Sequence, residues 1–281
     1  MLPVLTASTA AAAACATAWN STAVYTKDMT VSHGGHNWAA KWWTQNEEPG
    51  TTGQWGVWAD RGTCGGGGDD GGGDPSGFVV SEAQFNQMFP GRNSFYTYSG
   101  LIDAMKAHPA FAKTGSETTQ RREAAAFLAN VSHETGGLVH IVEQNEANYP
   151  HYCDRNQPYG CPAGQAAYYG RGPIQLSWNF NYKAAGDALG MDLLNNPWLV
   201  EREASVAWST GLWYWMTQSG PGTMSGHTAM VNDRGFGETI RSINGALECD
   251  GGNPAQVQSR INKYQSFVQI LGTSPGSNLS C

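Results

Sequence analysis

Apolar side chains recur at helical spacing along most of the chain beyond residue 78, and this pattern predicts a mainly α-helical domain. Six helices are expected, near residues 82–89, 101–105, 119–135, 197–215, 236–243 and 257–271. Ser81-Glu-Ala-Gln84 forms a capping box before the first of them, and Asn196-Pro197 is expected to open the fourth as one long helix. Glycine-rich loops separate the helices without a βαβ rhythm, so a parallel α/β sheet is not expected.

The third of these helices carries the first candidate for chemistry. It is expected to start at Thr118 or Thr119 and to end at Gly136-Gly137. Glu134 continues its apolar stripe, because it lies three residues after Val131. A carboxylate on a core-facing stripe is costly unless it is paired or protonated, and a protonated carboxyl is what a general acid requires. A surface glutamate on the last helical turn is the alternative.

The polar residues that follow this helix offer a second carboxylate. Glu143 and Glu146 lie just beyond the glycine pair, so a loop there can fold back and place either one opposite Glu134. Hydrolysis of a glycosidic bond needs two such carboxylates, one as acid and one as base. Either glutamate can also be an ordinary solvated loop charge. A zinc site of the HExxH type is excluded, because residue 137 is glycine rather than histidine.

Between Tyr168 and Trp178, apolar residues alternate with Gln175 and Ser177, which predicts a half-buried strand. The polar face of this segment can hydrogen-bond a sugar or hold a water molecule. A strand without a functional role is the alternative.

The first sixty residues show a different pattern, of short segments broken by glycine and proline. Strands are expected at Val24-Tyr25, Thr30–Ser32, Trp38–Trp43 and Trp55–Trp58. The tryptophans here exceed what so small a core can enclose, so some of them are expected to form an exposed binding surface. Trp42 and Trp43 are adjacent and cannot point to the same face of a strand, so if one packs in the core, the other is exposed.

The glycine-rich residues 65–77 separate these two patterns and are expected to form a flexible linker. They divide the chain into a small all-β module, 15–64, and a mainly α-helical domain, 78–281. Residues 1–14 are small and apolar and end in alanines that fit an A-x-A cleavage site. We interpret them as a signal-peptide remnant, although no basic residue precedes the apolar run; a disordered alanine-rich tail is the alternative.

Composition narrows the classes of partner and compartment. The 281 residues are 40% hydrophobic and 14% charged, with a net charge of −7. An acidic chain argues against a nucleic-acid partner, and no apolar run is long enough to span a bilayer. The six cysteines, an even number without a CxxC pair, indicate an oxidising compartment and a secreted, extracellular protein. Neighbouring cysteines are expected to pair, as Cys15–Cys64, Cys153–Cys161 and Cys249–Cys281.

Three motifs, in this order, closely resemble those of glycoside hydrolase family 19 chitinases: Phe127–Gly137, Tyr168–Ser177 and Ser242–Cys249. The likeness covers essentially all of 78–281 and is greatest to the compact, actinomycete-type bacterial members. It implies a lysozyme-like fold, in which two α-helical lobes flank a cleft and a small β element is present.

The segment 15–64 resembles the small carbohydrate-binding modules that are attached to bacterial chitinases. The resemblance implies that Trp42 and Trp43 stack on sugar rings and that Trp55 has a structural or supporting role. A flexible tether would then raise the local concentration of the enzyme on an insoluble surface.

The resemblance also implies a role for each site residue. In the family pattern, Glu134 corresponds to the general acid and Glu143, rather than Glu146, to the general base. Ser177 corresponds to the residue that holds the water molecule. Gln175 and Asn181 correspond to residues that contact the bound sugar, and Asn244 to a residue that lines the cleft. Glu248 and Arg260 correspond to residues that form a charge network with the acid. The implied reaction is an inverting single displacement within chitin, at β-1,4 bonds between N-acetylglucosamine units, and it needs no metal or organic cofactor.

Chitin and N-acetylglucosamine oligomers are therefore the expected partners, with no nucleic acid and no membrane, and a tethered secreted enzyme is expected to be monomeric. Two alternatives remain. One is a peptidoglycan hydrolase of related lysozyme-like fold, against which the chitin-binding module argues. The other is a catalytically silent chitin-binding lectin, against which the presence of Glu134, Glu143 and Ser177 together argues.

Overall fold

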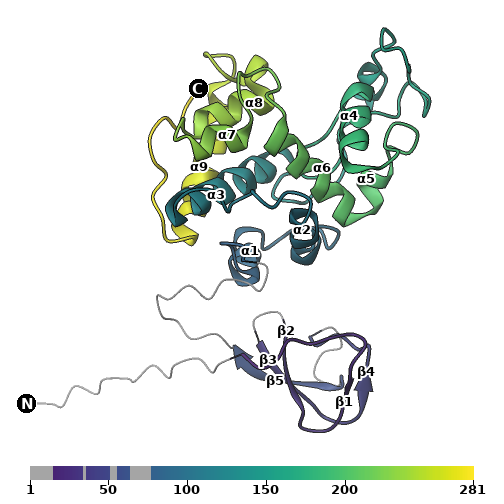
Figure 1. The fold of residues 1–281 in the computed structure, drawn as a ribbon, viewed down its shortest axis with the longest axis vertical. Helices are drawn as coiled ribbons and strands as arrows, with labels where there is room; N and C mark the ends of the chain where they lie inside the picture. The colour runs from purple at the N-terminus through teal and green to yellow at the C-terminus, as the bar shows by residue number, and fades with distance from the viewer. Residues whose placement is uncertain (1–14, 34–35, 51–55, 64–76) are drawn as a thin grey trace, which may run out of the picture. The chain divides into compact units, whose positions relative to one another are not determined.

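The computed structural model describes residues 15–33, 36–50, 56–63 and 77–281. The expected signal remnant, nearly all of the expected linker, Trp55 and Cys64 lie outside the described residues. The chain divides into two compact units, Met1–Gly72 and Gly73–Cys281, and each is considered by itself (Figure 1).

The small unit is built from short antiparallel strands. The strand β1 (Val24–Tyr25) pairs with β4 (Thr44–Gln45), and a three-stranded sheet has the order β2-β3-β5. Its strands are β2 (Thr30–His33), β3 (His36–Ala40) and β5 (Trp58–Thr63). A small core of Tyr25, Val31, Ala40 and Trp58 lies between the strands.

The two adjacent tryptophans do not lie in a strand. The expected strand over residues 38–43 ends at Ala40, and the backbone bends at Lys41-Trp42 before β4. Because no strand constrains them, the side chains of Trp42 and Trp43 are both exposed, by 51% and 61%. The expectation of at least one exposed tryptophan is confirmed, but the strand assumed for residues 41–43 was wrong.

The large unit is helical, as its apolar periodicity predicts. Its first elements are α1 (Glu82–Met88), α2 (Tyr98–Met105), α3 (Glu117–Glu134) and the 3₁₀ helix η2 (Glu146–Tyr152). The next are α4 (Asn179–Leu189), α5 (Leu199–Arg202) and α6 (Ala204–Thr217). The last are α7 (Gly226–Val231), α8 (Phe236–Glu248) and α9 (Pro254–Ile270). In the described part of the chain, no helix is long and apolar enough to cross a membrane.

The start signals were partly identified from the sequence. The capping box at Ser81 and Gln84 is present. The helix α3 starts at Glu117, before the expected threonines, because the Ser116 hydroxyl accepts a hydrogen bond from the backbone N–H of Thr119. The expected long helix after Asn196-Pro197 is divided into α5 and α6, because Glu203 between them has an extended backbone.

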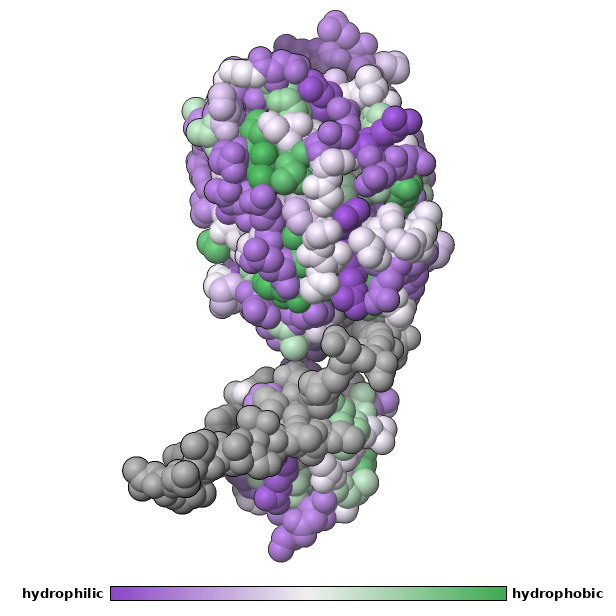
Figure 2. Space-filling model, turned by 90° about the vertical axis from the view of Figure 1, so that its left-hand side faces the viewer, coloured by the Kyte–Doolittle hydropathy of each residue, from purple (hydrophilic) through white to green (hydrophobic). Residues whose placement is uncertain are grey.

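Two apolar cores give the large unit its two lobes. One core lies among α1, α2, α3, α7, α8 and α9, and the other surrounds α4 and α5. The helix α6 contributes to both, with Trp208 and Trp215 in the first core and Ala207 and Trp213 in the second. Figure 1 shows α6 between the two groups of helices. The surface seen in Figure 2 is mostly polar with small apolar patches.

The segment over residues 168–178 is a turn rather than the expected strand. Arg171 and Leu176 form an isolated antiparallel bridge, and Arg171 also pairs with Val142. Gly172 and Gln175 have positive φ angles of 72° and 51°, which a strand does not permit. The expected alternation of burial holds from Ile174 to Ser177, because Ile174 and Leu176 are buried while Gln175 and Ser177 are partly exposed, but it ends at Trp178, which is also partly exposed.

Two of the three expected disulfides are confirmed, Cys153–Cys161 and Cys249–Cys281. Cys15 is also disulfide-bonded, while its expected partner lies outside the described residues. The second bridge ties the end of α8 to the C-terminal residue.

Candidate active site

Two adjoining hollows form one cleft in the large unit. The first has a volume of about 510 Å³ and is lined by both Glu134 and Glu143. The second has a volume of about 440 Å³ and extends past Asn181 and Tyr214. The two share five lining residues: Ile174, Gln175, Ser177, Ile243 and Asn244. Both volumes are within the usual range for small-ligand sites, and together they make an elongated groove that suits a chain-like substrate.

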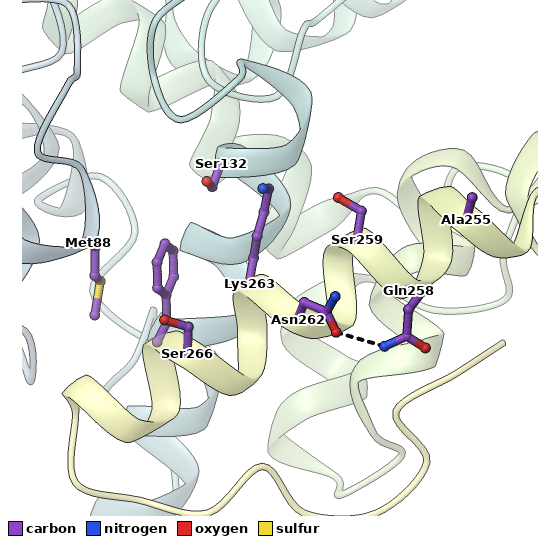
Figure 3. A pocket seen from close by; sticks show the side chains of 9 residues that line it. Met88, Ser132, Ala255, Gln258, Ser259, Asn262, Lys263 and Ser266 are labelled. Carbon is purple, nitrogen blue, oxygen red and sulfur yellow. Dashed lines mark hydrogen bonds between the residues drawn. The ribbon is translucent and has the colours of Figure 1, made fainter.

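A larger hollow, of about 690 Å³, lies along α9 and is lined by other residues (Figure 3). Its lining consists of serine and amide side chains with Lys263, Met88, Ala255 and Phe267. It contains no carboxylate, so it offers neither an acid nor a base for hydrolysis.

Glu134 lies at the last residue of α3, where Thr135 and two glycines end the helix. Its side chain is only 19% exposed and is paired with the guanidinium of Arg260 on α9. The surface alternative for Glu134 is therefore wrong, because the carboxylate is paired and mostly buried. The sequence expectation that a carboxylate on this stripe needs a partner is confirmed.

Arg260 is the centre of a buried charge network. Its side chain is 1% exposed and donates to both carboxylate oxygens of Glu248, at 2.8 and 2.7 Å. A third donation reaches the side-chain oxygen of Asn130 at 3.1 Å. Burial alone would raise the pKa of Glu248, but the hydrogen bonds and charge of Arg260 outweigh it and hold that pKa below its usual value. Glu248 therefore stays ionised.

Asn244 connects this network to the cleft. It donates from its amide nitrogen to Glu248 at 2.8 Å and also lines both hollows. Its backbone has non-helical angles, φ −141° and ψ 28°, in the middle of α8. The helix is thus interrupted at the residue whose side chain lies between the network and the groove.

Glu143 is held by neutral donors. Asn148 and Tyr152 donate to its Oε1 at 2.7 and 3.0 Å, and both belong to η2. The backbone N–H of Gly170 approaches Oε2 at 3.5 Å. Glu146, at the start of η2, is exposed and does not line the cleft. The two candidate bases are thus distinguished by position, and only Glu143 shares a cavity with Glu134.

Two tyrosines beside the glutamates remain protonated over the whole neutral range. Burial, followed by the hydrogen bond to Glu143, raises the pKa of Tyr152 to about 12. Burial and the nearby charge of Glu134 raise the pKa of Tyr214 to about 12 as well. Each phenol can therefore act as a hydrogen-bond donor but not as a base near neutral pH.

The wall between the two hollows is formed by the turn over residues 168–178. Gln175 donates to the carbonyl of Gly172 at 3.0 Å, which holds the turn closed. Gln175, two residues before Ser177, and Trp178, directly after it, have positive φ angles of 51° and 75°. Asn181 donates to the Ser177 carbonyl at 3.0 Å. This strained backbone presents Ser177 to the cavity that contains both glutamates.

The structure brings most of the sequence-predicted residues together, but not all of them. Five of them line the first hollow: Glu134, Glu143, Ser177, Gln175 and Asn244. A sixth, Asn181, lines the second hollow. Arg260 and Glu248 do not line the groove: Arg260 contacts Glu134, and Glu248 contacts Arg260 and Asn244. Trp42 and Trp43 belong to the small unit, which is a separate body.

Several contributors were not identified from the sequence. The donors Asn148 and Tyr152 lie in a short 3₁₀ helix, which has no apolar periodicity to mark it. Leu247 lines the cleft although it is 70% exposed. Its neighbours in the α8 motif were identified, but an exposed leucine carries no sequence signal of its own. Among the described residues, no cluster of three or more histidine, cysteine, aspartate or glutamate side chains could hold a metal ion.

Comparison with known proteins agrees with this geometry. Residues 79–281 match the family model for class I chitinases, and residues 18–59 match carbohydrate-binding module family 5/12. Endochitinase A from Zea mays is 44% identical over 211 residues, which cover 72% of this chain and 71% of the maize protein. Endochitinase B from the same plant is 48% identical over 192 residues, covering 68% of this chain and 64% of that protein.

Solved structures give the same result. Chitinase C from Streptomyces griseus HUT6037 is 72% identical, and the match covers 95% of this chain and 100% of that chain with a TM-score of 0.72. A bacterial family 19 chitinase is 75% identical over 73% of this chain and 100% of its own, also with a TM-score of 0.72. The resemblance drawn from three sequence motifs is thus confirmed. The chain belongs to the class I chitinases of glycoside hydrolase family 19, with a family 5/12 carbohydrate-binding module before the helical domain.

Proposed function

We propose that this protein is a secreted, monomeric endo-chitinase that cuts β-1,4 bonds between N-acetylglucosamine units by an inverting single displacement. Glu134 is the general acid and Glu143 the general base. The observation that carries the proposal is that these two carboxylates, from different structural elements, line one elongated cleft. Inverting glycosidases need such a pair about 6.5–9.5 Å apart, with room for a water molecule between base and sugar.

The charge network holds the Glu134 carboxyl group in place beside the cleft. One buried guanidinium, that of Arg260, is shared by Glu134 and Glu248. Arg260 lowers the pKa of Glu248 against the effect of burial, so Glu248 stays ionised next to the guanidinium. A fixed position at the wall of the cleft is what a general acid requires.

In the reaction, Glu134 gives its proton to the glycosidic oxygen as the bond from that oxygen to the anomeric carbon breaks. A water molecule attacks the anomeric carbon from the opposite face of the ring, and Glu143 takes the proton that the water loses. Ser177 helps to hold that water, and Gln175, Asn181 and Asn244 bind the sugars along the groove.

The small unit supplies the grip on an insoluble polymer. Trp42 and Trp43 are adjacent in the sequence, and both are exposed. The ammonium group of Lys41 lies 5.9 Å from the centroid of the Trp42 ring. Exposed aromatic side chains in the bend between two short strands suit stacking on sugar rings. Tethering then keeps the catalytic unit close to chitin without adding a catalytic contact.

The test is proton NMR of fresh digests of N-acetylglucosamine oligomers by wild type, Glu134→Gln and Glu143→Gln. We expect prompt release of the α-anomer by wild type and a loss of about 10²–10⁴-fold in kcat for each variant. Glu146→Gln is the matched control, because this exposed glutamate in the same loop region does not line the cleft, and its activity should be unchanged. Azide should restore turnover to Glu143→Ala, in which a small anion can occupy the space of the base.

Other outcomes would favour other functions. Prompt β-anomer would contradict inversion. Binding of chitin without cleavage would favour a lectin, and cleavage of peptidoglycan in preference to chitin would favour the cell-wall hydrolase. A Trp42→Ala/Trp43→Ala double variant adds a test of the module: its rate on soluble oligomers should be unchanged and its rate on insoluble chitin reduced.

A further inference from the structure

A stack of three side chains lies behind the loop that carries Glu143. The rings of Tyr149 and Tyr169 are parallel to within 12°, with centroids 3.7 Å apart. The guanidinium carbon of Arg171 lies 3.6 Å from the centroid of the Tyr169 ring. Two groups cannot both approach one face of a ring this closely, so Arg171 and Tyr149 lie on opposite faces of Tyr169.

The inner end of this stack is anchored in the second lobe. Arg171 is 1% exposed and donates from Nε to Glu201 of α5 at 2.6 Å. Its Nη1 donates to the hydroxyl of Tyr182 of α4 at 2.8 Å. The Tyr169 hydroxyl also donates to Glu201, at 3.1 Å. The ring of Tyr169 is therefore fixed in position by two helices of the lobe.

The outer end of the stack reaches the backbone of Glu143. The Tyr149 hydroxyl donates to the Glu143 carbonyl at 2.9 Å. The backbone N–H of Glu143 donates to the carbonyl of Gly170, also at 2.9 Å, and Gly170 lies between Tyr169 and Arg171 in the sequence. Both backbone polar groups of Glu143 are thus held by the stack or by the peptide that carries it.

We propose that the Tyr149–Tyr169–Arg171 stack is a positioning device for the general base, which transmits the rigidity of α4 and α5 to the loop and fixes the direction of the Glu143 carboxylate. The inference rests on the proposed role of Glu143. None of the three side chains lines the cleft, so they act through Glu143 and do not touch the substrate. Their loss should lower kcat and leave KM nearly unchanged, because a misplacement of about 1 Å can cost about a hundredfold in rate.

The test compares Tyr149→Phe, Tyr169→Leu and Tyr169→Phe on soluble N-acetylglucosamine oligomers. Tyr169→Leu removes the central ring and should lower kcat by about ten- to a hundredfold with KM within about twofold of wild type. Tyr169→Phe keeps the ring between its two neighbours and should restore most of that rate. Tyr149→Phe keeps the stack but loses the hydrogen bond to the Glu143 carbonyl, so its kcat should lie between those of Tyr169→Leu and Tyr169→Phe. Tyr159→Phe is the control, because its hydroxyl bonds to Gln157 at 3.1 Å, away from Glu143.

Each variant is then combined with Glu143→Gln. If the stack acts through the base, the second substitution should add nothing to the loss in Glu143→Gln, whereas independent effects would multiply. Three outcomes would overturn the positioning role but leave Glu143 as the base: losses of kcat that multiply, a raised KM, or normal activity of Tyr169→Leu while Glu143→Gln is inactive. Full activity of Glu143→Gln would overturn the proposed base, and this inference with it. Should Tyr169→Leu fail to fold, Tyr149→Phe, which removes a single hydroxyl, carries the same test.

Discussion

The two sides of the cleft hold their carboxylates by opposite means. Glu134 lies at the end of a long helix and is paired with Arg260, a buried cation that a second carboxylate shares. Glu143 lies on a loop, and its carboxylate oxygens receive only neutral donors within the described residues. The acid side depends on charge and the base side on geometry.

The difference matches what each group must do. A base has to accept a proton from water, and a cation bonded directly to it would oppose that uptake. The base-side cation, Arg171, is instead separated from Glu143 by the two tyrosine rings of the stack. An acid has to hold one proton and release it at the right moment. On this side a buried guanidinium, shared by two carboxylates, holds Glu134 at the wall of the cleft.

The largest expected effect comes from removal of the acid-side cation. Arg260→Met leaves Glu248, which is 4% exposed, without a cation, and breaking a buried pair in this way costs about 3–5 kcal/mol of unfolding free energy. Arg171→Met should cost less, about 2 kcal/mol, because its partner Glu201 is 23% exposed and can be hydrated. Urea unfolding of both variants measures the two losses.

A third arginine calibrates this comparison. Arg241 pairs with Asp250, which is 75% exposed, so Arg241→Met should change the unfolding free energy by less than about 1 kcal/mol. Adding Glu248→Gln to Arg260→Met should recover part of the loss. Equal losses for Arg260→Met and Arg171→Met would contradict the distinction between a side held by charge and a side held by geometry.

The two sides also differ in how far they could be predicted. Glu134 was placed correctly because helical periodicity is a local signal, and its need for a partner follows from burial alone. Arg260, in contrast, was connected to it only through the family resemblance, since 126 residues separate the two. The helical and all-β character of the two units was predictable for the same local reason.

Glu143 was named as a candidate base from the sequence, but the contacts that hold it could not be predicted, because they join irregular segments. Tyr149 and Tyr169 stack across a loop that contains a disulfide, and neither lies in an element with a repeating pattern. The donors to Glu143 come from a 3₁₀ helix with no buried residue. The bend that exposes Trp42 and Trp43 was missed for a related reason: aromatic residues favour a strand, and here tertiary context ended it at Ala40.

A smaller effect is expected from pH, with opposite signs for His133 and Tyr152. Burial, then the charge of Arg260, lowers the pKa of His133, next to Glu134, to about 4. Its folded pKa is thus below the unfolded value of about 6.5, so its contribution is fully present above pH 6.5 and is lost as pH falls toward 4. Allowing for its partial exposure, this amounts to about 1–2 kcal/mol. Glu248, whose pKa is also lowered, adds to the acid sensitivity.

On the base side, the pKa of Tyr152 is raised to about 12, by burial first and then by the hydrogen bond to Glu143. A raised folded pKa gives stability that is present below about pH 10 and is lost as pH rises toward 12. Urea midpoints measured from pH 4 to pH 11 should therefore fall at both ends. His133→Gln should reduce the slope of the acid limb alone and Tyr152→Phe that of the alkaline limb alone, each in part, because Glu248 and Tyr214 also contribute. A change of both limbs by either variant would contradict the assignment.

The smallest effect expected is a loss of one neutral donor from the base. Tyr152→Phe removes one of the two side-chain bonds to Glu143 Oε1 and leaves that of Asn148, so kcat should fall about fivefold, equivalent to about 1 kcal/mol, with KM unchanged. Tyr214→Phe is its acid-side counterpart, because that hydroxyl donates to the backbone carbonyl of Ser242 and not to a carboxylate. If geometry matters most at the base, steady-state kinetics on soluble oligomers should show the larger loss of kcat for Tyr152→Phe. A larger loss for Tyr214→Phe would mean that the acid side, too, depends on hydrogen-bond geometry.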